Sequence, residues 1–308
     1  MKVLITPRSF GKSDPEVFNM LENSGITVKK NETGSILSEA QLKDAIVDCT
    51  GVIIGVDPLN ADVLASAPNL RAVAKYGVGT DNIDMEYCER HGIKVSRTIG
   101  ANSAAVADYT FALMLALARS VIPIDSQCRR GDWRKIATSD VSGKTLGLIG
   151  LGAIARHVAR RAAGFDMKIL AFDVFWDESY ASANNIIKAD VDIICRECDF
   201  ISLHVPLLPE TQNIIGAKQI AQMKRSAYII NTARGGLIDE DALFSALKDH
   251  RIAGAGLDAF AEEPPANTEW FGLDNVVLGS HCAASTEGAA NAMGRMAVQN
   301  IIADLTAT

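Results

Sequence analysis

The stretch that decides the fold is TLGLIGLGAIARHVARRAAGFDMKILAFD, residues 145–173. It begins with a short apolar run, residues 146–149, of the kind found in buried parallel strands. Gly150 and Gly152 follow, and they permit a tight turn with close approach of the backbone to a ligand. Apolar residues then recur at helical spacing, and a second apolar strand ends at Asp173. The segment predicts a strand–turn–helix–strand unit.

This unit has the parts of a dinucleotide site. The exposed N–H groups at the start of its helix favour a pyrophosphate. Asp173 lies about 20 residues beyond the turn, where a carboxylate can bind both hydroxyls of an adenosine ribose. Its charge would repel a 2′-phosphate, and residues 174–176 supply no cation, so NAD is predicted over NADP. Ala155 stands where a third glycine is usual, and alanine is an accepted variant there. An ordinary βαβ turn is the alternative, but the flanking strands and the terminal Asp favour a nucleotide and hence a redox enzyme.

Length and composition limit the classes of protein to which the chain can belong. The chain has 308 residues and a net charge of −7, which indicate about two domains and argue against nucleic acid as the main partner. No apolar run approaches the ~20 residues of a transmembrane helix. The first ten residues, MKVLITPRSF, contain too short an apolar stretch for a signal peptide. We therefore expect a cytoplasmic protein that binds neither nucleic acid nor membrane.

The six cysteines are scattered along the chain, which suits reduced thiols. Cys195 and Cys198 form a single C-x-x-C pair. A redox or metal pair is one interpretation, but no second pair or nearby His completes a zinc set. The favoured interpretation is two small residues at a helix end, and no metal site is predicted.

Strand and helix patterns alternate almost throughout the chain, which predicts an α/β fold. We expect two Rossmann- or flavodoxin-like domains with parallel sheets and an interdomain cleft. The substrate domain would comprise residues 1–98 plus 286–308, and the NAD-binding domain residues 99–285. Residues 102–120 form an apolar helix that must be buried, either bridging the domains or in a dimer interface. Strands are expected at residues 3–6, 52–54, 72–74 and 94–96, and near residues 146, 169, 200, 227, 254 and 276.

Polar side chains gather at the ends of the predicted strands in the second half. His204 ends one strand, and Arg234, Asp258 and His281 each closely follow another. Because parallel sheets carry their sites at the carboxyl edge, we expect these groups at one edge. A nicotinamide enzyme that oxidises a hydroxyl needs a base for the proton and a cation for an acid substrate. Taken singly, each group could equally be a solvated charge or a helix cap.

Together, the motifs resemble those of the D-isomer-specific 2-hydroxyacid dehydrogenases, most of all the short phosphoglycerate dehydrogenase branch. The resemblance covers nearly the full length and implies an NAD-dependent D-2-hydroxyacid dehydrogenase that acts as a homodimer on a small 2-hydroxy or 2-keto acid. The motifs that carry it are, in order, KYGVGTDNID (75–84), GANSAAVAD (100–108), GKTLGLIGLGAIAR (143–156), LHVPLLPET (203–211), NTARGGLID (231–239), AGLDAFAEEPP (255–265) and SHCAAST (280–286).

The resemblance implies three catalytic residues. Arg234 would bind the substrate carboxylate and polarise the keto oxygen. His281 would be the acid/base that exchanges a proton with the substrate oxygen. Glu263 would pair with His281, orient its ring and favour the protonated form. Glu262 is the adjacent alternative, but the residue directly before Pro264 is the one that matches.

The resemblance also implies binding residues. The backbone of Ala153 and Ile154 would meet the pyrophosphate, and the N–H groups of Val78 and Gly79 would grip the substrate carboxylate. Asp258 would help to fix the nicotinamide amide. The full cofactor set is Gly150, Gly152, Ala153, Ile154, Asp173, His204, Val205, Pro206, Thr211, Thr232, Ala233 and Asp258. The full substrate set is Lys75, Tyr76, Val78, Gly79 and Arg134.

The sequence leaves two kinds of substrate possible, a phosphorylated acid and an unphosphorylated one. Lys75, with Arg134 and Lys135 in GDWRK, would suit a phosphate, which makes 3-phosphoglycerate/3-phosphohydroxypyruvate the leading pair. These cations could equally be solvated loop charges, and the alternative is an unphosphorylated acid such as glyoxylate or hydroxypyruvate. Transcriptional corepressors that sense NAD(H) resemble the same family, so a binding protein is a further alternative. Turnover of a 2-keto acid with NADH would distinguish an enzyme from such a sensor. Cys282 stands where the family often has an aliphatic residue, as a small filler or an oxidation-sensitive thiol.

Overall fold

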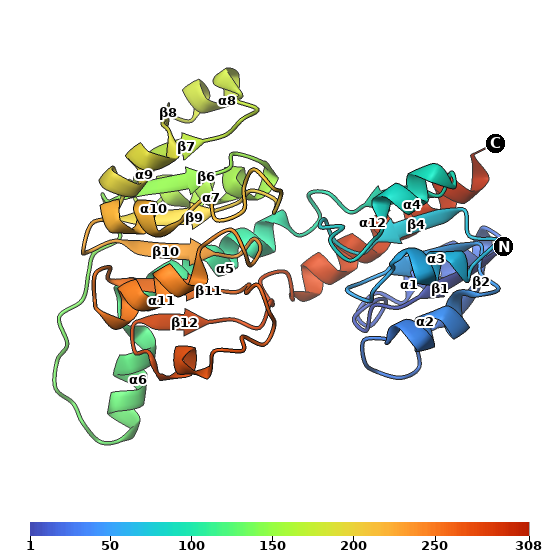
Figure 1. Ribbon diagram of the computed structural model, residues 1–308, viewed down its shortest axis with the longest axis horizontal. Coiled ribbons are helices and arrows are strands. Elements are labelled where there is room, and N and C mark those ends of the chain that lie inside the picture. The colour runs from blue at the N-terminus through green and yellow to red at the C-terminus, as the bar shows by residue number, and fades with distance from the viewer. Residues whose placement is uncertain (308) are drawn as a thin grey trace. The chain divides into compact units, whose positions relative to one another are not determined.

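The computed structural model describes residues 1–307 and divides the chain into two compact units (Figure 1). Unit 1 comprises Met1–Asn102 and the segment from Ala284 on, and unit 2 is Ser103–Ala283. The sequence analysis places these divisions after residues 98 and 285. Each unit contains a single parallel sheet, so the predicted α/β class is confirmed.

The sheet of unit 1 has five parallel strands in the order β2-β1-β3-β4-β5, which is the flavodoxin-like order. Its central strands β3 and β4 are buried along their whole length, as their apolar sequences predict. The strands are β1 (Lys2–Ile5), β2 (Thr27–Lys30), β3 (Gly51–Ile54), β4 (Ala72–Lys75) and β5 (Lys94–Arg97). The helices are α1 (Glu16–Asn23), α2 (Glu39–Ile46), α3 (Ala61–Ala65), α4 (Met85–Arg90) and α12 (Glu287–Thr306), of which α12 packs on β3, β4 and β5.

The sheet of unit 2 has seven parallel strands in the order β12-β11-β10-β9-β6-β7-β8. The chain builds outward from β6 to β8 and then restarts at β9 on the other side of β6, so the switch point lies between β6 and β9 (Figure 1). Ligands of such sheets bind beyond the carboxyl ends of the strands at the switch point. The strands are β6 (Thr145–Ile149), β7 (Lys168–Phe172), β8 (Ile186–Lys188), β9 (Phe200–Leu203), β10 (Tyr228–Asn231), β11 (Gly254–Leu257) and β12 (Val276–Leu278).

The remaining helices of unit 2 cover this sheet or extend from it. They are α5 (Ser103–Ala118), α6 (Val121–Arg129), α7 (Ala153–Ala163), α8 (Glu178–Ala183), α9 (Val191–Glu197), α10 (Ala217–Gln222), α11 (Glu240–Lys248) and the 3₁₀ helix η1 (Thr268–Gly272). The apolar helix α5 packs against α7, β10 and β11. A Cβ added at Gly256 of β11 would lie 2.9 Å from the Cβ of Leu113, so the helix lies close on the sheet. Its apolar composition is therefore explained by burial inside unit 2.

Among the elements that the sequence analysis does not name, two strands and one helix bury little surface. β2 and β8 lie at the edges of their sheets, and only one residue in these two strands, Ile186, is fully buried. Helix α6 has no buried residue at all, and Figure 1 shows it standing apart from the sheet of unit 2. Without a buried face, none of them produces the apolar periodicity from which helices and strands are predicted.

The C-x-x-C pair lies in the core of unit 2. Cys195 and Cys198 are fully buried, and burial raises the pKa of each thiol to about 12. Cys198 packs against Gly147, where an added Cβ would lie 2.9 Å from its sulfur. This agrees with the interpretation of the pair as small core residues. Within residues 1–307, no cluster of three or more His, Cys, Asp or Glu side chains is placed to hold a metal. No single described helix is long and apolar enough to cross a membrane. The bent pair α5–α6 has the length and composition of a membrane-crossing segment only when its two helices are taken together.

Candidate functional site

Two glycines shape the turn between β6 and α7, one through a close backbone contact and the other by leaving open space. Gly150 has φ +97°, and a Cβ there would lie 2.6 Å from the carbonyl oxygen of His204 at the end of β9. A side chain at residue 150 would thus push the two strands of the switch point apart. Around Gly152, by contrast, a Cβ would meet nothing within 4 Å. The protein leaves open space at that glycine, as a bound pyrophosphate requires.

The start of helix α7 is also open. Helices α8, α9 and α11 each begin with an aspartate, Asp177, Asp190 and Asp239 respectively, whose side chain accepts a backbone N–H of the first turn. Helix α7 begins at Gly152 and has no side-chain cap among the described residues. Its first N–H groups, including those of Ala153 and Ile154, are available to an anion. The residues present therefore fit NAD.

Asp173 ends β7 with its carboxylate already oriented. Its Oδ2 accepts the N–H of Leu151 at 2.6 Å, and its Oδ1 accepts the N–H of Phe175 at 2.7 Å. Each oxygen keeps further acceptor capacity for a ribose hydroxyl. The following Val174 and Phe175 are exposed and uncharged, so neither can hold a 2′-phosphate.

The loop after β9 carries four more predicted cofactor residues. His204 Nε2 lies 2.9 Å from Ser202 Oγ, and burial lowers the pKa of the His204 ring to about 3. Val205 packs against the Gly150 turn, because a Cβ at Gly150 would lie 3.0 Å from Val205 Cγ1. Thr211 Oγ1 donates to the carbonyl of Pro206 at 2.6 Å and so fixes the shape of the loop. These contacts place the loop beside the pyrophosphate turn.

The predicted acid/base and its carboxylate partner are in direct contact. His281 Nδ1 lies 2.9 Å from Glu263 Oε1 and 3.0 Å from Oε2. Both side chains keep substantial exposure, 46% for His281 and 40% for Glu263. No partner is bound to Nε2 of His281 within residues 1–307. That nitrogen is therefore the atom able to exchange a proton with a substrate.

Asp258 anchors the segment that carries His281. It is 1% exposed, and its two oxygens accept the N–H groups of Cys282 at 2.9 Å and Ala283 at 2.8 Å. His281 itself has φ +56°, a left-handed conformation that costs a non-glycine residue about 1 kcal/mol. The buried carboxylate stabilises that conformation. Thr232, predicted with Ala233 to contact the nicotinamide, has its Oγ1 3.0 Å from Thr110 Oγ1 of α5.

Tyr109 is a contact that the sequence analysis missed. The thiol of Cys282 donates to its hydroxyl at 3.3 Å, and a Cβ at Gly279 would overlap both this hydroxyl and Asp258. Burial is the main cause that raises the pKa of Tyr109 well above its usual range, so the hydroxyl stays protonated. Tyr109 lies in an apolar helix more than 170 residues before Cys282, so no local sequence pattern connects the two.

Arg234 is presented by a tightly folded loop after β10. The buried Asn231 donates from Nδ2 to the carbonyl of Arg234 at 2.7 Å and accepts the N–H of Ala233 at 3.0 Å. Arg234 Nη1 donates to the carbonyl of Ala233 at 2.7 Å. Gly235 follows, and a Cβ there would overlap the peptide between Phe260 and Ala261. The loop of Arg234 is therefore in backbone contact with the loop of Glu263.

In unit 1, the predicted substrate residues surround the loop after β4. Lys75 is 6% exposed, and its ammonium donates to Gly55 O and to Asn82 Oδ1 at 2.6 Å. The Tyr76 hydroxyl donates to the carbonyl of Ala290 in α12 at 3.0 Å. The N–H groups of Val78 and Gly79 have no acceptor within residues 1–307, which suits an anion.

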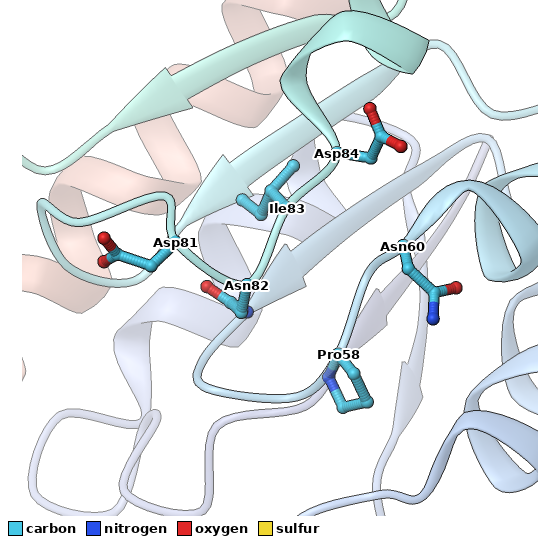
Figure 2. Close-up of a pocket in the computed structure, with 6 residues that line it drawn as sticks. All are labelled: Pro58, Asn60, Asp81, Asn82, Ile83 and Asp84. Atoms are coloured by element: carbon cyan, nitrogen blue, oxygen red, sulfur yellow. The ribbon is translucent and has the colours of Figure 1, made fainter. Parts of the chain in front are cut away.

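A separate pocket of about 360 Å³ lies beside this loop in unit 1 (Figure 2). Its lining comes from the segments on either side of the bridge between Leu59 and Ile83, and consists of Pro58, Asn60, Asp81, Asn82, Ile83 and Asp84. Asp84 caps helix α4 by accepting the N–H of Tyr87 at 2.8 Å. With two carboxyl groups in its wall, this pocket does not suit an acid substrate.

Arg134, the other predicted phosphate contact, lies in the exposed loop after α6. Its guanidinium binds Asp132 with contacts of 2.5 to 3.0 Å, and its side chain is 86% exposed. Exposed ion pairs of this kind contribute little to stability, so the pair does not by itself hold the loop in place. Of the three cations considered for a phosphate, Lys75 and Arg134 are therefore engaged with groups of their own unit.

Comparison with known proteins places this site in a family. The family model described as "D-isomer specific 2-hydroxyacid dehydrogenase, NAD binding domain" matches residues 111–283. A glyoxylate reductase of Korarchaeum cryptofilum is 40% identical over 274 residues, which cover 86% of this chain and 82% of that protein. A D-3-phosphoglycerate dehydrogenase of Methanocaldococcus jannaschii is 38% identical over 308 residues, or 98% of this chain and 57% of that longer protein. The crystal structure of TT0316 protein from Thermus thermophilus matches with a TM-score of 0.89 and 33% identity, covering 99% of this chain and 97% of that one.

The chain belongs to the D-isomer-specific 2-hydroxyacid dehydrogenase family. It is an NAD-dependent enzyme of this family, so the predicted resemblance, enzyme class and cofactor are confirmed. The roles of individual site residues stay predictions, which the following variants test.

Alanine at the two turn glycines should have opposite effects. Gly150→Ala places a methyl group against His204 O and should lower the free energy of unfolding by about 1–3 kcal/mol. Gly152→Ala should leave stability within about 0.5 kcal/mol but raise the Kd for NADH about tenfold, because its methyl group enters the space open to the pyrophosphate. Urea denaturation and NADH fluorescence titration measure the two quantities. Unchanged NADH affinity in Gly152→Ala would show that the pyrophosphate does not approach this glycine.

The His204 ring should stay neutral from about pH 5 to about pH 8. Burial lowers its pKa to about 3, so between that value and the ordinary 6.5 the unfolded chain binds a proton that the folded chain does not. The contribution of His204 to the free energy of unfolding is therefore complete above about pH 6.5 and declines as the pH falls toward 3. Two-dimensional ¹H–¹⁵N NMR of the histidine rings measures this, and a His204 midpoint between about 6 and 7 would contradict it.

Proposed function

We propose that the protein reduces a small unphosphorylated 2-keto acid, such as glyoxylate or hydroxypyruvate, to the corresponding 2-hydroxy acid with NADH, with D configuration where the product is chiral. The observation that carries the proposal is the contact of His281 Nδ1 with Glu263 at 2.9 Å, next to the Arg234 loop. A hydride acceptor with a keto oxygen and a carboxylate needs one proton donor and one cation beside it. This arrangement supplies both.

The three residues would divide the work as follows. NADH supplies the hydride that reduces the keto carbon. His281 donates its Nε2 proton to the keto oxygen, while Glu263 on Nδ1 orients the ring and balances its charge. Arg234 binds the carboxylate with its planar guanidinium and polarises the keto oxygen. In unit 1, the N–H groups of Val78 and Gly79 are proposed as further donors to an acid.

The contacts of the two predicted phosphate cations favour an unphosphorylated substrate. Lys75 is buried and donates to Gly55 and Asn82, so its ammonium is already held inside unit 1 and is not an exposed cation for a phosphate. Arg134 is bound by Asp132. The glyoxylate reductase relative, of which 82% is covered, supports the same choice.

3-Phosphohydroxypyruvate, with 3-phosphoglycerate as its product, is the second candidate. It is supported by the D-3-phosphoglycerate dehydrogenase relative, whose aligned region covers 98% of this chain. The chain spans only 57% of the length of that relative, so the match does not extend over the whole of it. The phosphorylated acid therefore belongs in any substrate comparison.

We expect NADH oxidation to be fastest with glyoxylate or hydroxypyruvate in a panel that includes pyruvate and 3-phosphohydroxypyruvate. His281→Asn and Glu263→Gln should each lower kcat about 100-fold or more, because the proton donor or its partner is lost. Glu262→Gln should stay within about twofold, since His281 contacts Glu263 and the neighbouring Glu262 is exposed. Initial rates at 340 nm with each acid measure the outcome.

Each other result of this panel has a definite meaning. Preference for 3-phosphohydroxypyruvate, lost in Lys75→Met, would replace the proposed substrate and retain the mechanism. Full activity of His281→Asn would overturn the mechanism. Binding of NADH with no turnover of any acid would favour the sensor class over the enzyme proposed here.

We also propose a homodimer, joined through the segment of α6 and the loop that follows it. Helix α6 has no buried residue. Four large apolar side chains of this segment are exposed in the single chain, namely Val121, Ile122, Trp133 and Ile136. An exposed apolar cluster of this kind marks an interface with another protein surface. A second copy of this chain is the partner that the family resemblance implies.

We also propose a cytoplasmic location. The free cysteines accord with a reducing, cytoplasmic compartment.

Sedimentation equilibrium should give twice the 32.9 kDa mass of the chain. Trp133→Ser should shift the mass toward the monomer, because it removes the most exposed apolar side chain of the segment. Ile36→Ser removes an exposed apolar side chain of unit 1 and should leave the dimer intact. A wild-type monomer at micromolar concentration would refute the assembly.

A further inference from the structure

Two loops carry the residues assigned to catalysis. The arginine loop, residues 232–238, follows β10 and contains Arg234. The relay loop, residues 258–263, follows β11 and contains Glu263. The two loops meet where Gly235 packs on the peptide between Phe260 and Ala261. That contact excludes a side chain at residue 235, but it supplies no hydrogen bond between the loops.

A single carboxylate lies against both loops. Glu240 lies in the first turn of α11, and its Oε1 accepts the N–H of Ala261 in the relay loop at 2.7 Å. The backbone N–H of Gly236 in the arginine loop lies near the same carboxylate and lowers its pKa. Glu240 thus hydrogen-bonds to the relay loop and faces the backbone of the arginine loop, within one or two residues of the point where the loops touch.

Glu240 is not needed to start its own helix. Asp239 is the N-cap of α11, and its Oδ1 accepts the N–H of Ala242 at 3.0 Å. Asp241, also in the first turn, gives the same favourable charge at the helix N-terminus. Glu240 is half-buried, and burial is the main cause that raises its pKa, while the two N–H groups oppose that shift. A carboxylate that is costly to bury, at a helix that already has a cap, indicates a role outside the helix.

The link from Glu240 continues to the acid/base. Next to Ala261, the N–H of Phe260 donates to Glu263 Oε1 at 3.2 Å. Glu263 Oε1 in turn lies 2.9 Å from His281 Nδ1. A shift of the peptide at Phe260–Ala261 would therefore move Glu263 and rotate the His281 ring relative to Arg234.

We propose that Glu240 is a positioning residue that holds the arginine loop and the relay loop in register, so that Arg234 and His281 act on the same substrate molecule. The inference rests on the catalytic roles proposed above for Arg234, Glu263 and His281. Glutamine cannot replace this carboxylate, because it presents one acceptor and one donor to two N–H groups.

The matched variants are Glu240→Gln and Asp241→Asn, which each remove one negative charge from the first turn of α11. Glu240→Gln should lower kcat about 10- to 100-fold and raise KM for the keto acid, because small displacements of catalytic groups are costly. The Kd for NADH should change less than about twofold, since Glu240 does not contact the pyrophosphate turn. Asp241→Asn should stay within about twofold in every constant. Equal constants for the two variants would overturn the proposal.

A double-mutant cycle separates positioning from general destabilisation. In the Glu263→Gln background, the His281 pair is already broken, so adding Glu240→Gln should lower kcat by no more than about threefold. A variant that acts only by unfolding part of the protein would lower kcat by the same factor in both backgrounds. Rates are expressed per NADH-binding site, so a loss of folded protein does not enter. Equal factors would reject the positioning role even if Glu240→Gln is less stable.

The same data distinguish this inference from the function on which it rests. If Glu263→Gln and His281→Asn retain full activity, the proposed catalytic residues are wrong. If they lose activity while Glu240→Gln behaves as Asp241→Asn does, only the role of Glu240 is wrong.

Discussion

The site in unit 2 depends on backbone-to-backbone contact at glycines. At Gly150 the turn after β6 touches the carbonyl of His204, and at Gly235 the arginine loop touches the peptide after Phe260. In both places a single methyl group would separate segments that come from different strands. Such contacts bring the carboxyl ends of β6, β9, β10 and β11 close enough for their loops to act together. Side chains then refine an arrangement that the main chain has already set.

Carboxylates that are buried or half-buried hold this arrangement in place. Asp258 binds the two N–H groups that follow His281, and so offsets the left-handed conformation of that histidine. Asp173 accepts one N–H from the cofactor turn and one from the segment after β7, and Glu240 accepts the N–H of Ala261 and faces the backbone of Gly236. A carboxylate can do this because it only accepts hydrogen bonds, and burial makes each N–H contact count for more. Carboxylate oxygens that could bind a ribose or a metal here accept backbone N–H groups and hold loops in place.

Local sequence patterns predict the site residues that lie within one short motif, but they do not predict contacts between segments that are distant in the sequence. The glycine turn, Asp173 and the strand-end positions of Arg234 and His281 follow from apolar periodicity and short motifs, because each motif lies within one βα unit. Glu240 and Tyr109 do not, since each makes its decisive contact with a loop at least 20 residues away and reads locally as an ordinary helix residue. Edge strands β2 and β8 are not predicted either, since they bury at most one residue each and carry little periodic signal.

Lys75 shows how burial changes the meaning of a charge. As a sequence feature it is a cation before an anion-binding loop, and a phosphate is its natural ligand. In the fold it is directed inward, with its ammonium on Gly55 and Asn82 and its Cε 3.7 Å from the position of a Cβ at Gly77. The two acceptors hold the ammonium inside unit 1, so the structure gives this cation buried partners that no local sequence pattern reveals.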